Sequence, residues 1–297
     1  MRVLITGGQG QLGRAVQAAL SGHEVSAPGH AELDITNAGQ VQEAVRGFRP
    51  EVVIHVAAWT DTAGCEADPA RALQVNGEGT RIVAEACAPA GAGARAGAAM
   101  LYVSTNEVFD GEKAEPYHEE DEPNPLNAYG RSKLEGERYV QTLLERHYVV
   151  RTSWLYGPGR VSFPEKIVQA AGERGRLRLV TDEVASPTWT VDLAGAIASV
   201  IQKPAWGVYH LTNHGYCSRL EWAVEILRLS GVEGVPVEPT TQREFGAPYH
   251  KAAFSALANV RGARAGIELR RWQEALAEHL QSSRSDSGAE APTMRVN

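Results

Sequence analysis

The sequence has little cysteine and no long hydrophobic run. Its 297 residues include three cysteines, Cys65, Cys87 and Cys217, without a Cys-x-x-Cys pair. This spacing argues against a zinc site and favours a reducing compartment. No apolar stretch approaches the ~20 residues of a membrane-spanning helix, and the first residues lack the apolar core of a signal peptide. We therefore expect a cytoplasmic protein without a membrane partner.

Basic residues are also scarce. Lys and Arg number 29 against 36 Asp and Glu, and the formal net charge is −7. Such a chain, which has no basic run, is not expected to bind nucleic acid. Its 43% apolar content suits one large α/β domain, alone or with a smaller one. No carboxylate cluster predicts a metal site, and the oligomeric state, including a homodimer, is left open.

The N-terminus combines an apolar strand, a glycine-rich turn and a helical pattern. Such a turn presents backbone N–H groups and the positive end of a helix to a diphosphate. Gly7 permits the tight turn, Gly10 lets the phosphates approach, and Gly13 lets the helix pack on its strand. We interpret the turn as a dinucleotide site rather than a plain strand-to-helix connection. The candidate contacts in it are Gly7, Gly10, Gln11, Leu12 and Gly13.

The Gly-x-x-Gly-x-x-Gly spacing resembles that of the short-chain dehydrogenase/reductase superfamily. The next predicted strand, residues 23–27, ends in Pro28-Gly29-His30, without an acidic residue for an unphosphorylated ribose. His30 is the candidate partner of a 2′-phosphate, although an ordinary loop role fits it equally well and Arg would bind a phosphate better. The sequence therefore favours NADPH and leaves NADH open.

Further cofactor contacts are expected after the glycine turn. Asp34 and Ile35 resemble the superfamily's turn beside the adenine, although Asp34 or Thr36 would also suit the cap of a helix that begins near Ala38. A strand over residues 52–56 runs into small residues that let a cofactor approach the backbone. The candidates there are Ala57, Ala58 and Thr60. In the superfamily, the position of Asn76 lies beneath the cofactor; a local hydrogen-bond partner is the alternative.

Tyr129 and Lys133 lie four residues apart in a segment with a helical pattern. Their side chains therefore share one helix face, and the ammonium is expected to lower the pKa of the phenol. Alone, this pattern equally describes a half-buried tyrosine beside a solvated lysine. Thr105 follows a predicted strand over residues 100–103, at the sheet edge where such folds bind ligands, and is the candidate to hydrogen-bond a substrate carbonyl.

Together these motifs resemble the dTDP-4-dehydrorhamnose reductase family of extended short-chain reductases. The resemblance continues to about residue 280. The matching stretches are Thr6 to Gly13, Val103-Ser104-Thr105, Val108-Phe109-Asp110-Gly111, Pro125 to Lys133, Arg151 to Gly157, Ser186-Pro187-Thr188, Gly207 to Asn213 and Ser255-Ala256-Leu257.

The resemblance implies a Rossmann-type doubly wound parallel sheet with a smaller C-terminal substrate-binding lobe. Residues 1–158 would form the dinucleotide-binding domain, with returning segments near 188–213, and residues 159–280 would form most of the lobe. We expect lobe helices near residues 164–173, 218–229 and 268–280. The Ala- and Gly-rich residues 89–99 are expected to form a flexible loop, and the polar tail 281–297 is expected to be disordered.

The family's catalytic residues match Thr105, Tyr129 and Lys133, and its nucleotide-sugar tryptophan matches Trp154, which otherwise reads as a core aromatic. The implied reaction is NAD(P)H-dependent reduction of dTDP-4-dehydro-L-rhamnose to dTDP-L-rhamnose. Tyr129 would donate the proton, and Lys133 would hold the nicotinamide ribose while lowering the pKa of Tyr129. The alternatives are reduction of another dTDP-4-keto sugar in a secondary-metabolite pathway, or a non-catalytic regulatory subunit of the same fold.

Two segments depart from the family pattern. Asn106 and Glu107 replace the usual Asp and Tyr, and that Tyr lines the sugar site in the family. The stretch 60–63 also differs, again on the substrate side. These departures leave the identity of the sugar open while the expected hydride chemistry is unchanged. The candidate substrate contacts are Thr105, Asn106, Glu107 and Trp154.

Overall fold

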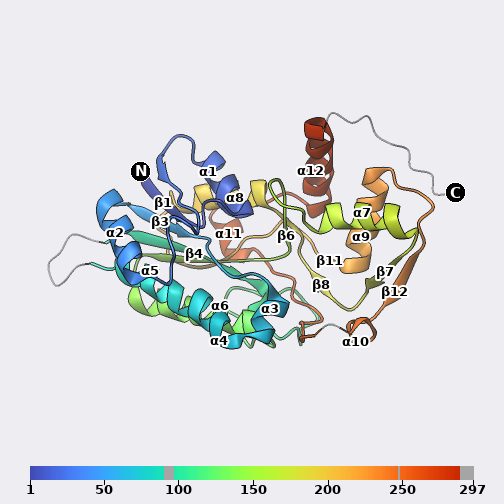
Figure 1. Cartoon of the computed structure of the whole chain (residues 1–297), viewed down its shortest axis with the longest axis horizontal. Coiled ribbons are helices and arrows are strands. Elements are labelled where there is room, and N and C mark those ends of the chain that lie inside the picture. Colours follow the sequence, from blue (N-terminus) through green and yellow to red (C-terminus); the bar gives the residue numbers. More distant parts are fainter. Residues whose placement is uncertain (90–96, 247, 288–297) are drawn as a thin grey trace.

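The centre of the computed structural model is a six-stranded parallel sheet with the strand order β10-β5-β4-β3-β1-β2 (Figure 1). The structure describes residues 1–89, 97–246 and 248–287. The strands of this sheet are β1 (Arg2–Thr6), β2 (Glu24–Ser26), β3 (Val52–His55), β4 (Ala99–Thr105), β5 (His147–Thr152) and β10 (Gly207–His210). The order confirms the predicted doubly wound fold, because the chain reverses direction across the sheet after β2, and β3 pairs with the other side of β1.

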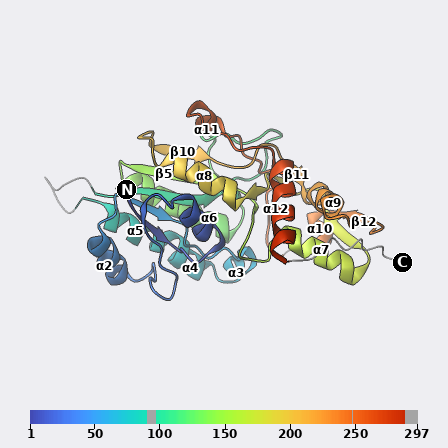
Figure 2. The same ribbon diagram turned by 90° about the horizontal axis from the view of Figure 1, so that it is seen from above.

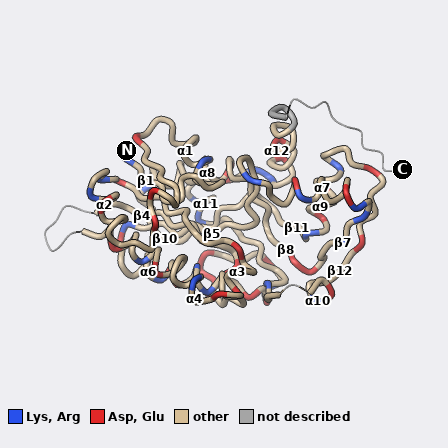
Figure 3. Tube along the Cα trace, viewed as in Figure 1, with Lys and Arg blue, Asp and Glu red and all other residues tan. Residues whose placement is uncertain are grey.

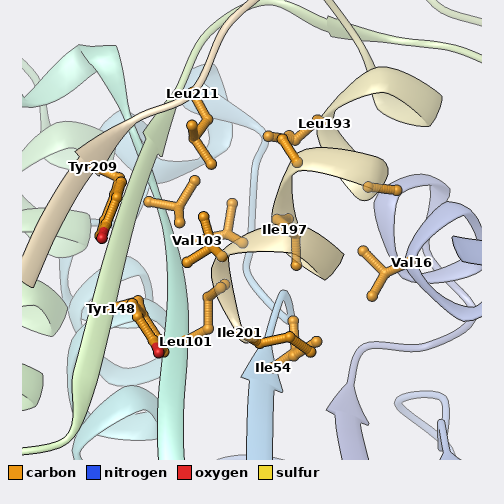
Figure 4. Packing of buried hydrophobic residues seen from close by; sticks show 14 of the residues in the cluster. Val16, Ile54, Leu101, Val103, Tyr148, Leu193, Ile197, Ile201, Tyr209 and Leu211 are labelled. Carbon is orange, nitrogen blue, oxygen red and sulfur yellow. The ribbon is translucent and has the colours of Figure 1, made fainter. Parts of the chain in front are cut away.

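Helices cover both faces of the sheet, because its strands are apolar on both sides. Side chains such as Ile54, Leu101 and Val103 face a core shared with α1 (Gln11–Ala19) and α8 (Thr190–Val200) (Figure 4). The alternate residues, such as Leu4 and Met100, face a second core. The helices of that second face are α2 (Ala38–Phe48), α5 (Gly79–Cys87) and α6 (Ala128–Leu143).

The predicted cap of α2 is wrong. Asn37 caps this helix by accepting a hydrogen bond from the backbone N–H of Gln40 at 3.1 Å. Asp34 lies one turn earlier, and its carboxylate accepts from the backbone and hydroxyl of Thr36. Asp34 therefore stabilises the turn before the helix.

The helical segment over residues 69–87 contains a π-helical turn. The chain passes from α4 (Pro69–Ala72) through η1 (Leu73–Glu78) into α5. The wider turn places Asn76 in the buried interior, where its side chain pairs with the backbone N–H and carbonyl of Trp59. Such π-turns occur frequently at functional sites.

The C-terminal lobe lies at one end of the sheet (Figure 2). Its helices α7 (Phe163–Arg174) and α9 (Arg219–Ser230) agree with the expected positions. The third helix, α12 (Trp272–Ser287), starts later than expected because Arg271 pairs with His214 in a β-bridge. It also continues past residue 281, so the expected tail does not begin there. Residues 288–297 of that tail and 90–96 of the expected loop lie outside the described residues.

Short elements complete the chain. The short paired strands are β7 (Leu177–Val180) with β12 (Val237–Thr240), β8 (Val184–Ala185) with β11 (Cys217–Ser218), and β6 (Leu155–Tyr156) with β9 (Thr188–Trp189). The remaining helices are α3 (Thr62–Ala67), η2 (Asn106–Val108), α10 (Gln242–Phe245) and α11 (Val260–Arg264). No helix within the described ranges is long and apolar enough to cross a membrane. Acidic and basic residues are interspersed along the chain (Figure 3).

Helix α6 packs directly against the sheet because two of its positions carry no side chain. A Cβ at Gly136 would lie 2.5 Å from the Tyr102 hydroxyl and 2.8 Å from the Asn76 carbonyl. A Cβ at Gly130 would clash with the carbonyl of Glu107. These contacts fix the distance between α6 and the ends of β4 and η1.

Gly136→Ala should therefore destabilise the protein by about 1–3 kcal/mol, because the methyl group overpacks the helix contact. The matched control is Gly195→Ala in α8, where an added Cβ meets nothing within 4 Å. Alanine there should stabilise the protein by up to about 1 kcal/mol through helix propensity. Denaturant unfolding measures both variants, and a stabilised Gly136→Ala protein would contradict the proposed packing constraint.

Candidate active site

A continuous groove runs along the carboxyl edge of the sheet. It consists of one cavity of about 900 Å³ and another of about 420 Å³. Both are lined by Gly7, Gly10, Val56 and Ala58, which follow or lie between the ends of β1 and β3. The groove is therefore long enough to hold an extended ligand across the middle of the sheet.

The glycine turn has the geometry needed to cradle a diphosphate. Gly7 has a φ of +73°, and a Cβ at this position would lie 2.8 Å from the Cα of Ala57. A Cβ at Gly13 would clash with the carbonyl of Gly7. Helix α1 begins after Gly10 with no side-chain cap and no acidic residue in its first turn. Its first N–H groups therefore face the groove, where an anion can accept their hydrogen bonds.

The larger cavity collects several residues expected to contact the cofactor. His30, Asp34, Ile35 and Ala57 all line it. The carboxylate of Asp34 has a lowered pKa because Thr36 donates two hydrogen bonds to it.

Sequence reasoning did not find Arg71, which also lines the larger cavity. Its guanidinium lies 4.7 Å from the centre of the Trp59 ring, in a cation–π contact. Arg71 comes from α4, far along the chain from the glycine turn, so no local motif indicated it.

The smaller cavity brings together the predicted catalytic and sugar-binding residues. Its wall includes Thr105, Tyr129 and Lys133. Thr105 is the last residue of β4, while Tyr129 and Lys133 lie on the first turns of α6. The other expected residues in this wall are Gln11, Leu12, Thr60, Asn106, Glu107 and Trp154.

Three further hydroxyls line the smaller cavity. Within the described part of the chain, the hydroxyls of Ser104, Thr152 and Ser153 are buried and have no hydrogen-bond partner. Buried polar groups are normally paired, so these hydroxyls mark a cavity suited to a polar ligand.

The predicted effect of Lys133 on Tyr129 is wrong for this structure. Burial, followed by the negative charge of Glu107, raises the pKa of Tyr129. Burial also lowers the pKa of Lys133 to about 7, although Glu137, one helical turn further on, opposes this shift. Lys133 is thus only partly charged at neutral pH, and the phenol keeps its proton.

Lys133 lies against aromatic and polar groups of the buried interior. Its ammonium nitrogen is 4.2 Å from the centre of the Tyr102 ring, and the Tyr102 hydroxyl donates to its backbone carbonyl at 3.2 Å. His55 lies beside Tyr102 with a ring separation of 5.6 Å, and burial lowers its pKa to about 3. His55 is therefore neutral and adds no positive charge near Lys133.

Asn127 joins α6 to its surroundings, a role that the sequence analysis did not predict. Its side-chain oxygen caps α6 by accepting from the N–H of Gly130 at 2.8 Å. Its side-chain nitrogen donates to the Glu107 carboxylate at 2.7 Å and to the His250 carbonyl at 3.1 Å. One residue thus fixes the start of the helix that carries Tyr129, the position of Glu107, and a loop of the lobe.

Asn76 similarly ties α6 to the turn after β3. Its side-chain nitrogen donates to the Ser132 hydroxyl at 3.0 Å and to the Trp59 carbonyl at 3.0 Å. Asn76 therefore has structural hydrogen-bond partners, but these lie in the turn after β3 and on α6 rather than locally along the chain.

Trp154 forms the far wall of the smaller cavity. Its φ is +42°, which is unusual for a bulky residue and directs the ring toward the lobe. The ring stacks on Trp222 with a centroid separation of 5.4 Å and an angle of 10°. Trp154 therefore packs on the lobe core, as expected for a core aromatic, and its ring also lines the cavity.

Sequence reasoning also missed the charged side of this cavity. Arg219 and Lys251 both line it and both bind the carboxylate of the buried Glu183, at 2.9 Å and 3.1 Å. The Arg219 guanidinium lies 3.5 Å from the centre of the Trp154 ring, and the exposed Arg160 adds a third cation to the cavity. These residues come from separate segments of the lobe, which no local sequence pattern connects.

Among residues 1–89, 97–246 and 248–287, no group of His, Cys, Asp and Glu is arranged to hold a metal ion. The three cysteines are buried and unpaired by disulfides.

The sequence and structure are similar to those of known reductases of dTDP-linked keto sugars. A family model described as the RmlD substrate binding domain matches residues 1–285. The chain is 38% identical to a dTDP-4-dehydrorhamnose reductase of Streptomyces griseus, over 99% of this chain and 98% of that protein. It is also 38% identical to a probable dTDP-4,6-dihydroxy-2-methyloxan-3-one 4-ketoreductase of Streptomyces antibioticus, over 94% of each. A dTDP-4-dehydrorhamnose reductase of Bacillus anthracis in complex with NADP superposes with a TM-score of 0.89 and 34% identity, over 95% of this chain and 99% of that chain.

The lowered pKa of Lys133 predicts how stability changes with pH. The unfolded chain binds a proton at Lys133 up to about pH 10.5, whereas the folded chain releases it near pH 7. The cost of burying the Lys133 ammonium therefore lowers the free energy of unfolding by its full amount below pH 7, and this cost diminishes as the pH rises toward 10.5. Lys133→Met should raise the free energy of unfolding, with a gain that shrinks by up to ~1.4 kcal/mol per pH unit in this window.

Denaturant unfolding at pH 7, 8 and 9 measures this effect. The exposed Lys166 on α7 provides the control, because Lys166→Met should leave the pH dependence unchanged. Parallel stability curves for wild type and Lys133→Met would show that the Lys133 ammonium is solvated in the folded protein.

Proposed function

The chain belongs to the dTDP-4-dehydrorhamnose reductase family, and we propose that it reduces the 4-keto group of a dTDP-linked deoxysugar with NADPH. The substrate favoured by the resemblance is dTDP-4-dehydro-L-rhamnose. The observation that carries the proposal is the meeting of Thr105, Tyr129 and Lys133 in a cavity that opens into the glycine-lined groove. A ketone held in this cavity would lie between a proton donor and the nicotinamide end of the cofactor site.

The groove fits a dinucleotide. The glycine turn and the uncapped start of α1 would hold the diphosphate, and the larger cavity would hold the adenosine. Two side chains of that cavity suit a 2′-phosphate, the imidazole of His30 and the guanidinium of Arg71. Their presence supports NADPH as the cofactor. The relative from Bacillus anthracis was solved with NADP. When bound, the reduced nicotinamide supplies the hydride.

The side chains of the smaller cavity would complete the reduction. Thr105 and Tyr129 hydrogen-bond the ketone oxygen and stabilise the negative charge that grows on it. Tyr129 then donates its proton to this oxygen. Its raised pKa suits this role, because the phenol stays protonated until the alkoxide, a stronger base, forms. Lys133 would hold the nicotinamide ribose from its place one turn along α6.

The cationic side of the cavity suits the diphosphate of the nucleotide-sugar. Arg219 and Lys251 are held in place by Glu183, while Arg160 lies at the exposed rim. Trp154 offers a ring face beside Arg219. We propose that residues 1–158, with 188–213, bind the cofactor, and that most of residues 159–280 form the sugar-nucleotide lobe.

Turnover distinguishes a reductase from a cofactor-binding regulatory subunit. The purified protein should oxidise NADPH when it is supplied with a dTDP-4-keto-6-deoxysugar, as followed by the loss of reduced-cofactor absorbance. A protein that binds NADPH but leaves every such sugar unreduced would favour the regulatory role. The relative from Streptomyces antibioticus is named for a different 4-keto sugar, so the panel should include several sugars.

Tyr129→Phe should lower kcat by about 10²- to 10⁴-fold, because the variant lacks the positioned proton donor. Binding of NADPH, measured by calorimetry, should stay nearly unchanged. Tyr139→Phe is the matched control on the same helix, since the Tyr139 hydroxyl binds Glu78 outside the cavity. Wild-type turnover in Tyr129→Phe would remove Tyr129 from the mechanism.

Arg219→Gln should weaken dTDP binding by about 10- to 100-fold, because a charged hydrogen-bond donor to the diphosphate is lost. The control is Arg228→Gln in the same helix, where the side chain is 65% exposed and pairs with Glu225. Calorimetric titration with dTDP measures both variants. Equal dTDP affinity in the two variants would place the diphosphate elsewhere.

A further inference from the structure

We propose that Glu107 determines sugar specificity: its carboxylate accepts a hydrogen bond from the sugar hydroxyl on the carbon next to the ketone. In a 4-keto-6-deoxyhexose this is the hydroxyl at C3, because C5 carries only the methyl substituent and the ring oxygen. The site would thus select a nucleotide-linked 4-keto sugar with a C3 hydroxyl over its 3-deoxy counterpart. This inference rests on the proposed reductase function.

The place of Glu107 in the cavity supports this role. The backbone N–H of Glu107 donates to the hydroxyl oxygen of Thr105 at 3.1 Å, so the two residues are held side by side. Both line the smaller cavity together with Tyr129. Since Thr105 and Tyr129 would bind the ketone oxygen, Glu107 lies beside the group attached to a neighbouring ring carbon.

The Glu107 carboxylate is fixed but retains an oxygen for a ligand. Asn127 donates a hydrogen bond to Oε2 at 2.7 Å. Among the described residues, no other group donates a hydrogen bond to this carboxylate, so Oε1 accepts none. An oriented carboxylate oxygen that faces a cavity is a strong acceptor for a hydroxyl and has no donor to offer in return.

The charges around Glu107 allow its effect on sugar selection to be distinguished from its effect on diphosphate binding. Burial raises the pKa of Glu107, and the positive charges of Lys251 and Arg219 oppose this shift. Glu183 neutralises part of both positive charges. Two carboxylates thus face two cations around Glu107, and Arg160 adds a further positive charge at the exposed rim. Removing the Glu107 charge leaves a net positive wall facing a diphosphate, so loss of this carboxylate should favour nucleotide binding even as it impairs sugar selection.

The test compares a dTDP-4-keto-6-deoxyhexose with its 3-deoxy counterpart, using kcat/KM for each. Wild type should prefer the hydroxylated sugar by about 100-fold or more, because a site that binds a hydroxyl rejects an analogue without one. Glu107→Ala should reduce this preference to within about 10-fold. Glu107→Gln, which keeps the shape and an acceptor oxygen, should give an intermediate preference, and the exposed Glu115→Gln should match wild type.

Binding of dTDP to each variant provides a second readout. Both Glu107 variants should bind dTDP as tightly as wild type or up to about 10-fold more tightly, and this gain should diminish at high salt. An unchanged sugar preference in both variants overturns the proposal. Weaker dTDP binding also overturns it, because the carboxylate would then hold the site together.

The failure of the reductase proposal is recognised separately. If wild type reduces neither sugar, the proposed function fails and the specificity role fails with it. If wild type reduces both sugars equally well, the reductase function stands and the role of Glu107 is overturned.

Discussion

The close contact between α6 and the sheet is the constraint on which the site depends. Gly136 lets the helix lie against Tyr102 and the carbonyl of Asn76, and Gly130 admits the carbonyl of Glu107. A helix displaced outward by even one methyl group would carry Tyr129 away from Thr105, which is fixed at the end of β4. The proposed proton transfer from Tyr129 requires hydrogen-bond distances, so packing behind the helix would control that step.

The same contact forces charged groups into the interior. Lys133 is 2% exposed, and Glu137, one turn further along α6, is fully buried. Glu137 is compensated by Arg151 of β5, which binds it through several hydrogen bonds including one of 2.7 Å. Lys133 has no such partner at hydrogen-bond distance among the described residues, and its pKa falls accordingly. Glu137 thus has a hydrogen-bonded charged partner, whereas Lys133, which lines the smaller cavity, has none among the described residues. A buried group with a shifted pKa in a cavity is a candidate functional group rather than a stabilising one.

The sequence predicted the parts of the molecule that local patterns encode. The glycine turn, the strand-end Thr105 and the helical pairing of Tyr129 with Lys133 each occupy a short segment, and the cavities contain them all. The predicted lowering of the pKa of Tyr129 was wrong because this pKa depends on burial and on the charge of Glu107. A spacing of four residues in the sequence cannot reveal either of these. The residue predicted to cap α2 was wrong because several residues with capping side chains lie in succession before that helix. Arg219 and Lys251 were missed because Glu183 brings them together only through tertiary structure.

The residues that were predicted and those that were missed belong to two differently built halves of the site. The residues proposed for hydride and proton transfer lie on the parallel sheet and on α6, where strand register and helix packing leave little freedom. The residues proposed for the nucleotide-sugar lie on the lobe, whose short strand pairs and loops tolerate substitution more readily. Glu107 belongs to the first half by position, next to Thr105, and to the second by contact, since Asn127 links it to the loop at His250. On the proposed roles, a substitution of Glu107 would change which sugar is accepted without moving the groups that react with the ketone, so specificity and chemistry would vary independently within one cavity.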